Sequence, residues 1–438
     1  MHIPRPKNPE YSAIVVRIPV TVALQGRDRI VGVPIYGRQA IVSKDQYEVG
    51  ELALFFPTEV QLSEAYAHAN NLFREAHYNA DPLQAGYFEL NARVKAIKFA
   101  GHRSDALVMP LNSLTGLGLD PTLLREGDVF DHFGGVEICR KYTIPVREGR
   151  APNMQSSKQT RVAAKHFPEH VDTANWWRNR DLIGDHEQII VSQKLHGTSI
   201  RVGMVPTRLP KPRTRLARLG HWIAERTGVP IQTYEYAPAY GSRRVIKDAG
   251  DPGQNHHYAA VDGVDLWTRH GRLLDGLLPE GFMVYGELIG WNPDGTPIQR
   301  GYTYDIPANM AELWVYRVTR INAQGYQTDL SWDQLVEFCH SIGLNPVPVL
   351  WRGKAGDFNV DEWMDIRYFD AGHVQAIPLE FGNRDLVDEG VVIRRDGLKP
   401  TLLKAKSPAF LRHETGELDA GVPDIESVES ATELADAA

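Results

Sequence analysis

Residues 193–201 read QKLHGTSIR, a polar stretch between two apolar ones. The flanking residues 188–191 and 199–205 have the apolar, β-branched character of strands, so we expect a rigid hairpin that turns tightly at Gly197. Such a hairpin would place the amine of Lys194 at the mouth of a cleft. A free lysine has a pKa of about 10.4, and burial, neighbouring cations or a metal-bound phosphate can lower it and activate the amine. Taken alone, the pattern is more typical of an exposed lysine beside a hairpin glycine.

Four other segments place charged side chains at the ends, or on one face, of expected strands. Two arginines beside a glycine turn suit phosphate recognition, and two lysines at alternate positions share one face of a strand. If these groups and two strand-end carboxylates converge on Lys194, they would suit a nucleoside triphosphate and a divalent cation, because Mg²⁺ prefers few carboxylates together with phosphate oxygens. The segments are 241–244 (GSRR), 284–288 (VYGEL), 388–393 (DEGVVI) and 402–406 (LLKAK).

In order and spacing, the five segments resemble the covalent nucleotidyltransferase superfamily of DNA ligases, RNA ligases and mRNA capping enzymes. The ordered set favours a nucleophilic role for Lys194 over an exposed surface lysine. The matches are motif I at Lys194, motif Ia at Ser242-Arg243, motif III at Tyr285-Gly286-Glu287, motif IV at Glu389-Gly390 and motif V at Lys404-Ala405-Lys406.

Within that superfamily the chain is similar to ATP-dependent RNA ligases. His196 stands where DNA ligases and capping enzymes usually carry Asp, and His-Gly is familiar among RNA ligases that seal nicked duplexes. Residues 47–57 and 93–98 resemble the N-terminal OB-type domain of one RNA ligase family, and residues 167–173 resemble the entry to its catalytic domain. DNA ligases and capping enzymes carry an OB-fold after motif V instead, where this chain has only residues 407–438. The resemblance covers roughly residues 10–412.

This resemblance implies a role for each central residue. Lys194 would attack the α-phosphorus of ATP and carry AMP, which would pass to a 5′-phosphate before a 3′-hydroxyl seals the nick. Lys404 and Lys406 would contact the phosphate, and Glu389 would help position Mg²⁺ or Mn²⁺. Glu287 would hold a ribose hydroxyl.

The resemblance leaves alternatives open around the nucleoside. Tyr316 stands where the family has an aromatic residue stacked on adenine, although Leu313 or Trp314 could take that place and Tyr316 could be a core tyrosine. Arg243 would meet the nicked strand or a phosphate.

The turn itself would supply further nucleotide contacts from Leu195, Gly197 and Ser199. Relatives often have Asn or Arg at the position of Ser199, where that residue touches the ribose. Arg201 could supply the missing contact, or it could be a surface strand residue. Candidate nick contacts in the first domain are Lys98, His102 and Arg103.

We expect an α+β chain with an OB-like β-barrel at residues 1–146, a linker at 147–166 and a nucleotidyltransferase domain at 167–412. The second domain would be ATP-grasp-like, with antiparallel sheets and flanking helices. In the first domain a helix would run from Ser63 through Ala76. Strand-like segments there are 11–18, 29–35, 39–42, 51–56, 92–99 and 106–110, and in the second domain 188–191, 199–205, 282–289, 313–318 and 390–394.

Three patterns predict side-chain placement. In 92–99, apolar residues alternate with basic ones, which predicts one buried face (Val94, Ile97, Phe99) and one basic face (Arg93, Lys95, Lys98). A capping box at Ser331 and Gln334 predicts a helix that buries Leu335, Val336, Phe338 and Ile342. A second helix, following Thr214, would carry Leu216, Leu219, Trp222 and Ile223 on one face.

The net charge of −7 is uneven along the chain. Residues 414–438 contain eight acidic residues and no Lys or Arg, so we expect residues 413–438 to form a disordered acidic tail. Residues 194–250 contain eleven Lys and Arg against three acids. Phosphate binding follows such local fields rather than the total. The basic residues 206–226 could grip a duplex backbone or form a solvated helix.

The two cysteines, Cys139 and Cys339, are too few for a disulfide framework or a four-thiolate zinc site, and apolar neighbours predict buried free thiols. No apolar run approaches the ~20 residues that span a bilayer, so we expect a cytoplasmic protein without a membrane partner. The expected partner is RNA or an RNA-containing nicked duplex. The alternatives are a DNA ligase, a GTP-dependent capping guanylyltransferase, and an RNA-binding protein with an inactive nucleotide pocket.

Overall fold

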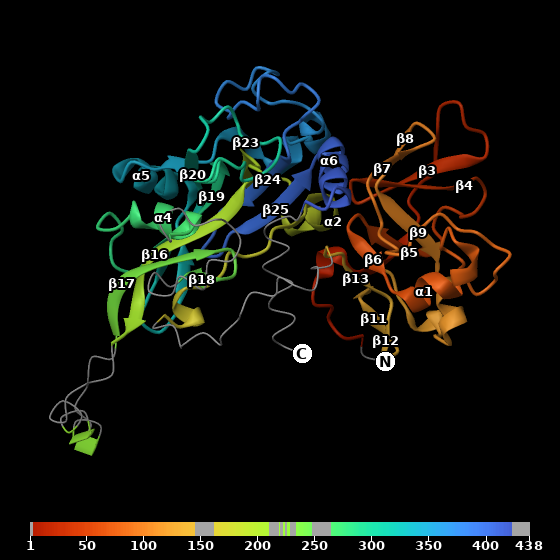
Figure 1. Ribbon diagram of the computed structural model, residues 1–438, viewed down its shortest axis with the longest axis horizontal. Coiled ribbons are helices and arrows are strands. Elements are labelled where there is room, and N and C mark those ends of the chain that lie inside the picture. Colours follow the sequence, from red (N-terminus) through yellow and green to blue (C-terminus); the bar gives the residue numbers. More distant parts are fainter. Residues whose placement is uncertain are drawn as a thin grey trace.

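The computed structural model describes residues 3–144, 162–209, 234–247 and 264–422, and in addition Leu219, Trp222, Ile223, Arg226 and Thr227. These residues form an α+β fold with mostly antiparallel sheets. An N-terminal part, red to orange in Figure 1, lies beside a larger part that contains the rest of the chain. Helix α6 (Pro408–Asp419) lies where the two parts meet (Figure 1).

Short sheets build the N-terminal part. Strand β1 (Ala13–Arg17) is central, and its side chains point alternately into two hydrophobic clusters, Ala13 and Val15 into one and Ile14 and Val16 into the other. No sheet among the described residues closes into a barrel, so the expected OB-like barrel is not confirmed. The first sheet has the strand order β10 (Val129–Phe130), β1, β5 (Leu52–Pro57), β9 (Ala106–Pro110). The second sheet has the strand order β2 (Val22–Ala23), β3 (Ile30–Ile35), β4 (Arg38–Ser43). The two-stranded sheets pair β6 (Val60–Leu62) with β13 (Cys139–Lys141), β7 (Ile97–Phe99) with β8 (His102–Ser104), and β11 (His132–Phe133) with β12 (Val136–Glu137).

The helix predicted after Ser63 exists but is shorter than expected. Ser63 caps α1 (Glu64–Ala69) by accepting a hydrogen bond from the Tyr66 amide at 3.2 Å. The helix ends at Ala69 rather than Ala76, because Asn70 closes it and Asn71 then adopts a left-handed φ of 56°.

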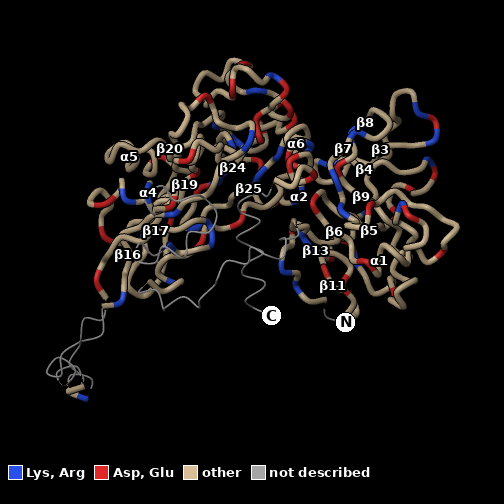
Figure 2. Tube along the Cα trace, viewed as in Figure 1, with Lys and Arg blue, Asp and Glu red and all other residues tan. Residues whose placement is uncertain are grey.

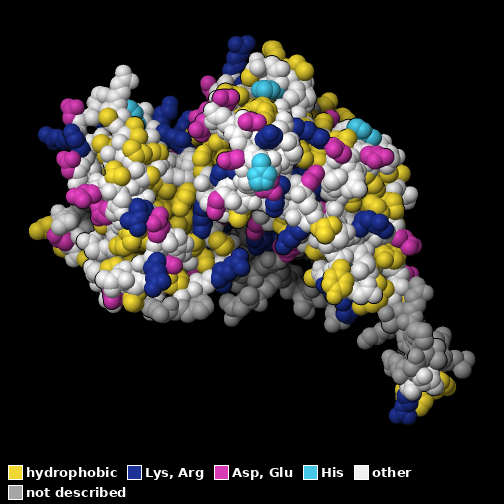
Figure 3. All heavy atoms as spheres, turned by 180° about the vertical axis from the view of Figure 1, so that it is seen from behind, with side chains coloured by type: hydrophobic (Ala, Val, Ile, Leu, Met, Phe, Trp, Pro, Cys, Tyr) yellow, Lys and Arg dark blue, Asp and Glu magenta, His cyan; other side chains and the backbone are white. Residues whose placement is uncertain are grey.

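Val94 is buried as predicted, but the pattern predicted for residues 92–99 is wrong for Arg93, Ile97 and Phe99. Only Ile97–Phe99 form a strand, and Ile97 and Phe99 are 43% and 49% exposed, whereas Arg93 is 2% exposed. Arg93 can be buried because Glu59 accepts hydrogen bonds from its Nε and Nη2 at 2.9 and 2.7 Å. Figure 3 shows several hydrophobic side chains on the surface of this N-terminal part.

Two large sheets form the second part. The first has the order β14 (Ala174–Asn175), β25 (Thr401–Lys406), β24 (Gly390–Arg395), β15 (Gln188–Gln193), β23 (Val349–Lys354). The second has the order β18 (Ile246–Lys247), β17 (Tyr234–Ser242), β16 (Thr198–Arg208), β19 (Phe282–Gly290), β20 (Ala311–Ile321), β21 (Gln327–Asp329), with β22 (Asn345–Pro346) paired to β20. The strands predicted from the apolar runs are present, and the additional strands are β14, β17, β18, β21, β22 and β23.

The predicted hairpin at Gly197 is wrong, because its two strands belong to different sheets. Strand β15 pairs with β23 and β24, whereas β16 pairs with β17 and β19. Residues 194–197 therefore cross from one sheet to the other. A Cβ atom at Gly197 would lie 2.1 Å from the Leu288 carbonyl oxygen, so the close approach to β19 requires glycine.

Helices cover the sheets. In α5 (Trp332–Ser341) both hydrogen bonds of the predicted capping box are present, and Leu335 is buried while Val336, Phe338 and Ile342 are partly buried. Both cysteines are buried and free, as predicted. The other helices are α2 (Trp176–Asn179), α4 (Leu266–Arg272) and α6, with 3-10 turns at Pro9–Tyr11, Ala76–Tyr78, Leu111–Leu117, Pro121–Leu123, Ala164–His166, Arg180–Leu182, Ala355–Asp357 and Val360–Trp363.

The acidic C-terminal segment is partly helical. Helix α6 continues through Asp419, so the expectation of disorder is wrong for residues 413–419. Phe410 and Leu411, earlier in the same helix, are buried and anchor it in the core. Residues 423–438 and most of the helix predicted after Thr214 lie outside the described residues. None of the helices in the described ranges combines the length and apolar character that a bilayer crossing requires.

Candidate active site

A cavity of about 1030 Å³ is lined by residues of both parts of the molecule. All but one of the residues predicted for the site lie in its wall, although their segments are far apart in the sequence. The exception is Arg201. The residues that the cavity brings together are Lys194, Leu195, Gly197, Ser199, Arg243, Glu287, Tyr316, Glu389, Lys404 and Lys406.

Lys194 follows the last residue of β15, and its amide donates to the Gly390 carbonyl at 2.9 Å. Its side chain is 23% exposed and its Nζ lies 2.8 Å from Glu389 Oε1. Because β15 and β24 are neighbours in the sheet, the lysine at the end of one strand meets the carboxylate at the start of the other. The backbone thus fixes both groups.

Glu389 is the buried centre of the charge cluster, with a side chain that is 2% exposed. Its Oε1 lies 3.2 Å from Lys406 Nζ, and its Oε2 lies 3.8 Å from His196 Nδ1. Burial alone would raise the pKa of Glu389, but the charges of Lys194 and Lys406 lower it below its ordinary value. Among the described residues, Oε2 has no hydrogen-bond partner.

The two lysines of β25 point to the same side, as predicted, and pair across the strand with Val392 and Gly390. Burial, followed by the charge of Lys406, lowers the pKa of Lys404 to about 8. Burial would also lower the pKa of Lys406, but the charges of Glu414 and Glu389 raise it well above its ordinary value. Lys406 is therefore a fixed cation, while Lys404 loses its proton more readily.

His196 is enclosed by aromatic rings. Tyr302 and Phe410 present their edges to its imidazole with centroid distances of 5.0 and 4.9 Å. The His196 amide donates a hydrogen bond to the Tyr304 hydroxyl oxygen at 2.7 Å. Burial lowers the pKa of His196 to about 4, so the ring is neutral at neutral pH. His196, which stands where DNA ligases and capping enzymes usually carry Asp, therefore carries no charge.

Glu287 lies on β19 opposite Ser199, directly below the crossing. It accepts a hydrogen bond from the Gly197 amide at 3.1 Å and one from Ser199 Oγ at 3.4 Å. Gln299 Nε2 donates to the Gly197 carbonyl at 2.8 Å. The carboxylate and an amide thus hold the turn after the lysine in place.

Neither expectation for Arg201 describes its position. The side chain is 2% exposed rather than on the surface, and it donates to the backbone carbonyls of Ser242, Phe167 and Arg244. These contacts tie β16 to the loop that carries Arg243. Arg201 thus organises the cavity wall from behind.

The remaining predicted residues lie at the edge of the cavity. Arg243 forms an ion pair with Asp172 and is 28% exposed. The Tyr316 ring lies 4.8 Å from that of His170, another lining residue. Leu313, Trp314 and Tyr316 all pack against the main hydrophobic cluster, but of the three only Tyr316 lines the cavity. The geometry thus favours Tyr316 over its two neighbours as the aromatic wall.

Two carboxylates near the site were missed in the sequence. Asp388 accepts hydrogen bonds from Gln193 Nε2 at 2.7 Å and the Tyr368 amide at 2.8 Å, and burial raises its pKa to about 6. Glu414 binds Lys406 but was assigned to the acidic tail. The signal for its helix was available in Ser407 and Pro408, which are typical of a helix start.

Comparison with known proteins identifies similar folds. The sequence model of the RNA ligase family matches residues 187–406, whereas no curated protein sequence matches the chain. An apo mutant of Naegleria gruberi RNA ligase is 15% identical with a TM-score of 0.57, covering 93% of this chain and 99% of its own. The same ligase with PPi is 13% identical with a TM-score of 0.57, and a mutant with ATP and Mn is 13% identical with a TM-score of 0.56; each match covers 92% of this chain and 98% of the other. These structural matches establish similarity of fold over both parts of the molecule.

Proposed function

This chain belongs to the RNA ligase family, and on that premise we propose that it is an ATP-dependent enzyme that seals 3′-hydroxyl/5′-phosphate nicks in RNA through an AMP adduct on Lys194, in RNA repair. The geometry around one carboxylate oxygen carries the proposal. Glu389 Oε1 lies 2.8 Å from Lys194 Nζ and 3.2 Å from Lys406 Nζ. A nucleophile and a phosphate-binding cation thus stand together in one cavity.

In the first step a bond forms between Lys194 Nζ and the α-phosphorus of ATP, while the bond from that phosphorus to the pyrophosphate oxygen breaks. The lysine must lose a proton before it attacks. The cations Lys404 and Lys406 would offset the negative charge that develops on the phosphate oxygens.

The site fits a divalent cation such as Mg²⁺ or Mn²⁺. Glu389 lines the cavity, and its Oε2 is buried and lacks a hydrogen-bond partner among the described residues, so this oxygen could serve as an anionic ligand. Among the described residues, no group of three or more His, Cys, Asp or Glu side chains could hold a metal ion by itself. Phosphate or water oxygens would therefore complete the ligand shell. When bound, the ion would withdraw charge from the phosphate.

The nucleoside would lie over the turn that follows Lys194. Glu287 would accept a hydrogen bond from a ribose hydroxyl; its position in the cavity wall, beside Gly197 and Ser199 from which it accepts hydrogen bonds, supports this role. Tyr316 would stack on adenine, and Leu195 would form the apolar floor. Naegleria gruberi RNA ligase, a mutant of which has been solved with ATP and Mn, supports ATP as the nucleotide.

The AMP would then move from Lys194 to a 5′-phosphate, and a 3′-hydroxyl would attack that phosphate and release AMP. We assign the N-terminal residues 1–146 to an OB-like domain that binds RNA, joined by a linker at 147–166 to a catalytic domain at 167–412. Tyr11, Arg140 and Lys141 of the N-terminal part line the same cavity, which supports this role.

Labelled nucleotide tests the proposal directly. The protein should form an acid-labile, base-stable adduct with ATP and Mg²⁺ or Mn²⁺, and Lys194→Ala should abolish it without lowering the melting temperature. A persistent adduct in Lys194→Ala would refute the assignment, and an adduct with GTP alone would indicate a capping enzyme. Nicks built with ribose or deoxyribose at the 3′-hydroxyl end then separate an RNA ligase from a DNA ligase.

A further inference from the structure

Helix α6 returns a second carboxylate to the catalytic lysines. After β25 the chain turns at Ser407 and Pro408, and the first turns of α6 bring Glu414 back over Lys406. Glu414 Oε1 and Oε2 lie 3.1 and 3.4 Å from Lys406 Nζ. Its side chain is only 19% exposed and lines the same cavity as Lys194. It lies outside all five segments that resemble superfamily motifs.

We propose that Glu414 is a positioning residue that holds the Lys406 ammonium in place for the reaction at Lys194; this inference rests on the proposed ligase activity. Glu389 Oε1 alone does not define the position of Lys406, because it also accepts from Lys194 at 2.8 Å. Glu414 contacts Lys406 with both oxygens from the opposite side of the chain turn. The ammonium is thus fixed between two carboxylates, with Phe410 4.9 Å below it.

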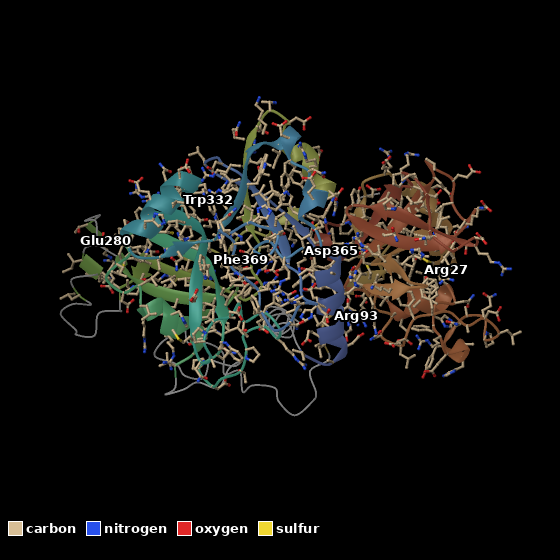
Figure 4. The ribbon with its side chains drawn as sticks, turned by 90° about the horizontal axis from the view of Figure 1, so that it is seen from above. Arg27, Arg93, Glu280, Trp332, Asp365 and Phe369 are labelled. Carbon is tan, nitrogen blue, oxygen red and sulfur yellow. The ribbon has the colours of Figure 1, made fainter. Side chains whose placement is uncertain are left out.

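The N-terminal part sets the position of α6 and therefore of Glu414. Thr415, the next residue, accepts a hydrogen bond from the Ala96 amide at 3.1 Å and donates one to Glu59 Oε1 at 3.2 Å. One turn later, Asp419 accepts from Arg93 Nη1 at 2.9 Å and from Lys95 Nζ at 3.2 Å. Figure 4 shows Arg93 at the boundary between the N-terminal part and α6, and Figure 2 shows acidic positions of α6 beside basic positions of the N-terminal part.

These contacts form a continuous path from the proposed RNA-binding part to a lysine of the reaction centre. Arg93 has no exposed side-chain surface, so it cannot exchange its partners for water without opening the boundary. Lys406 therefore stands where the packing of α6 against the N-terminal part places it.

The test compares four full-length proteins: wild type, Glu414→Gln, Glu414→Asp and Glu417→Gln. Glu417 is the matched control, because it lies on the same helix and its carboxylate pairs with Arg300 at 3.9 Å instead of with the catalytic lysines. Single-turnover formation of the labelled AMP adduct is measured over a range of ATP concentrations. Melting temperatures are recorded for every protein.

We expect Glu414→Gln to lower the maximal rate of adduct formation about ten- to a hundredfold, since a misplaced catalytic group has effects of that size. Half-saturation by ATP should change less than the rate. Glu414→Asp, which keeps the charge, should recover part of the rate, and Glu417→Gln should match wild type. If Glu414→Gln melts too low to assay, the maximal rate of adduct formation is compared between Glu414→Asp and Glu417→Gln instead, and Glu414→Asp should be the slower of the two.

A rate for Glu414→Gln equal to that of Glu417→Gln would overturn the inference, as would a defect confined to ATP half-saturation. If the wild-type protein makes the adduct while Glu414→Gln behaves as wild type, only the positioning role fails. If the wild-type protein makes no adduct, the proposed function fails and the inference falls with it.

Discussion

Glu389 Oε1 lies 2.8 Å from Lys194 Nζ, and this contact joins the end of β15 to the start of β24. The carboxylate is 2% exposed and also meets Lys406, so two ammonium groups share one buried anion. The group of three carries a net positive charge in a cavity where water screens poorly. Such a cluster favours a phosphate-rich ligand, and removing its anion has consequences that can be measured.

Replacing Glu389 with Gln should lower the rate of AMP-adduct formation by about a hundredfold or more. The change removes the anion that holds both lysines, and that anion is also the expected ligand of the divalent cation. It should also destabilise the fold by about 1–3 kcal/mol, because two neighbouring ammonium groups lose their counter-charge. Labelled ATP and chemical denaturation measure the two effects. Glu280→Gln, at an exposed position, is the control. An adduct rate within a factor of about three of the control would contradict the central role of Glu389.

His196 provides a second test, because related superfamily members usually have Asp at this position. A carboxylate placed there would be buried between the rings of Tyr302 and Phe410 and close to Glu389, whose Oε1 is already shared by two lysines. We expect His196→Asp to lower the stability by about 1–3 kcal/mol through burial and like-charge repulsion. His196→Asn, which lacks the charge, should be destabilised less. Equal melting temperatures for the two variants would show that charge is not the reason for histidine.

The sequence predicted the site better than it predicted the connections around it. Each motif-like residue lies in or directly beside a strand, and such strands can be recognised from their apolar composition. What the sequence did not reveal is that β15 and β16 belong to different sheets, because local patterns carry no information on which strands pair. The hairpin expected at Gly197 is instead a crossing.

Charged residues that act through tertiary contacts were the main failures. Arg93 and Arg201 were expected on a basic face or in a ribose contact, yet both are buried because distant residues satisfy their guanidinium groups. Glu414 was assigned to a disordered tail because the segment is acidic, whereas its partner lies in the preceding strand. Composition describes charge but not the partner that neutralises it.

The crossing at Gly197 predicts a steric effect of a single methyl group. A Cβ atom there would lie 2.1 Å from the Leu288 carbonyl oxygen, so Gly197→Ala should push the turn away from β19 and misplace Lys194. We expect the AMP adduct to fall about a hundredfold, since small misplacements cost that much. Gly416→Ala in α6 is the control, because no atom lies within 4 Å of its added Cβ, and alanine should stabilise the helix by about 0.5–1 kcal/mol. Full adduct formation by Gly197→Ala would show that the turn can move without consequence.

The ion pair between Glu414 and Lys406 predicts how stability depends on pH. Burial would raise the pKa of the Glu414 carboxyl, but the neighbouring Lys406 ammonium dominates and lowers it to about 2, from an ordinary value of 4.5. A carboxylate with a depressed pKa contributes its full stability above the ordinary value and loses it as the pH falls toward the depressed one. The stability difference between wild type and Glu414→Gln should therefore be largest near pH 6–7, at up to about 3 kcal/mol, and should shrink steadily below about pH 4.5. Denaturation at several pH values measures it, with Glu417→Gln in parallel. A difference that stays constant from pH 7 to pH 3 would mean that Glu414 stabilises α6 by packing rather than by its charge.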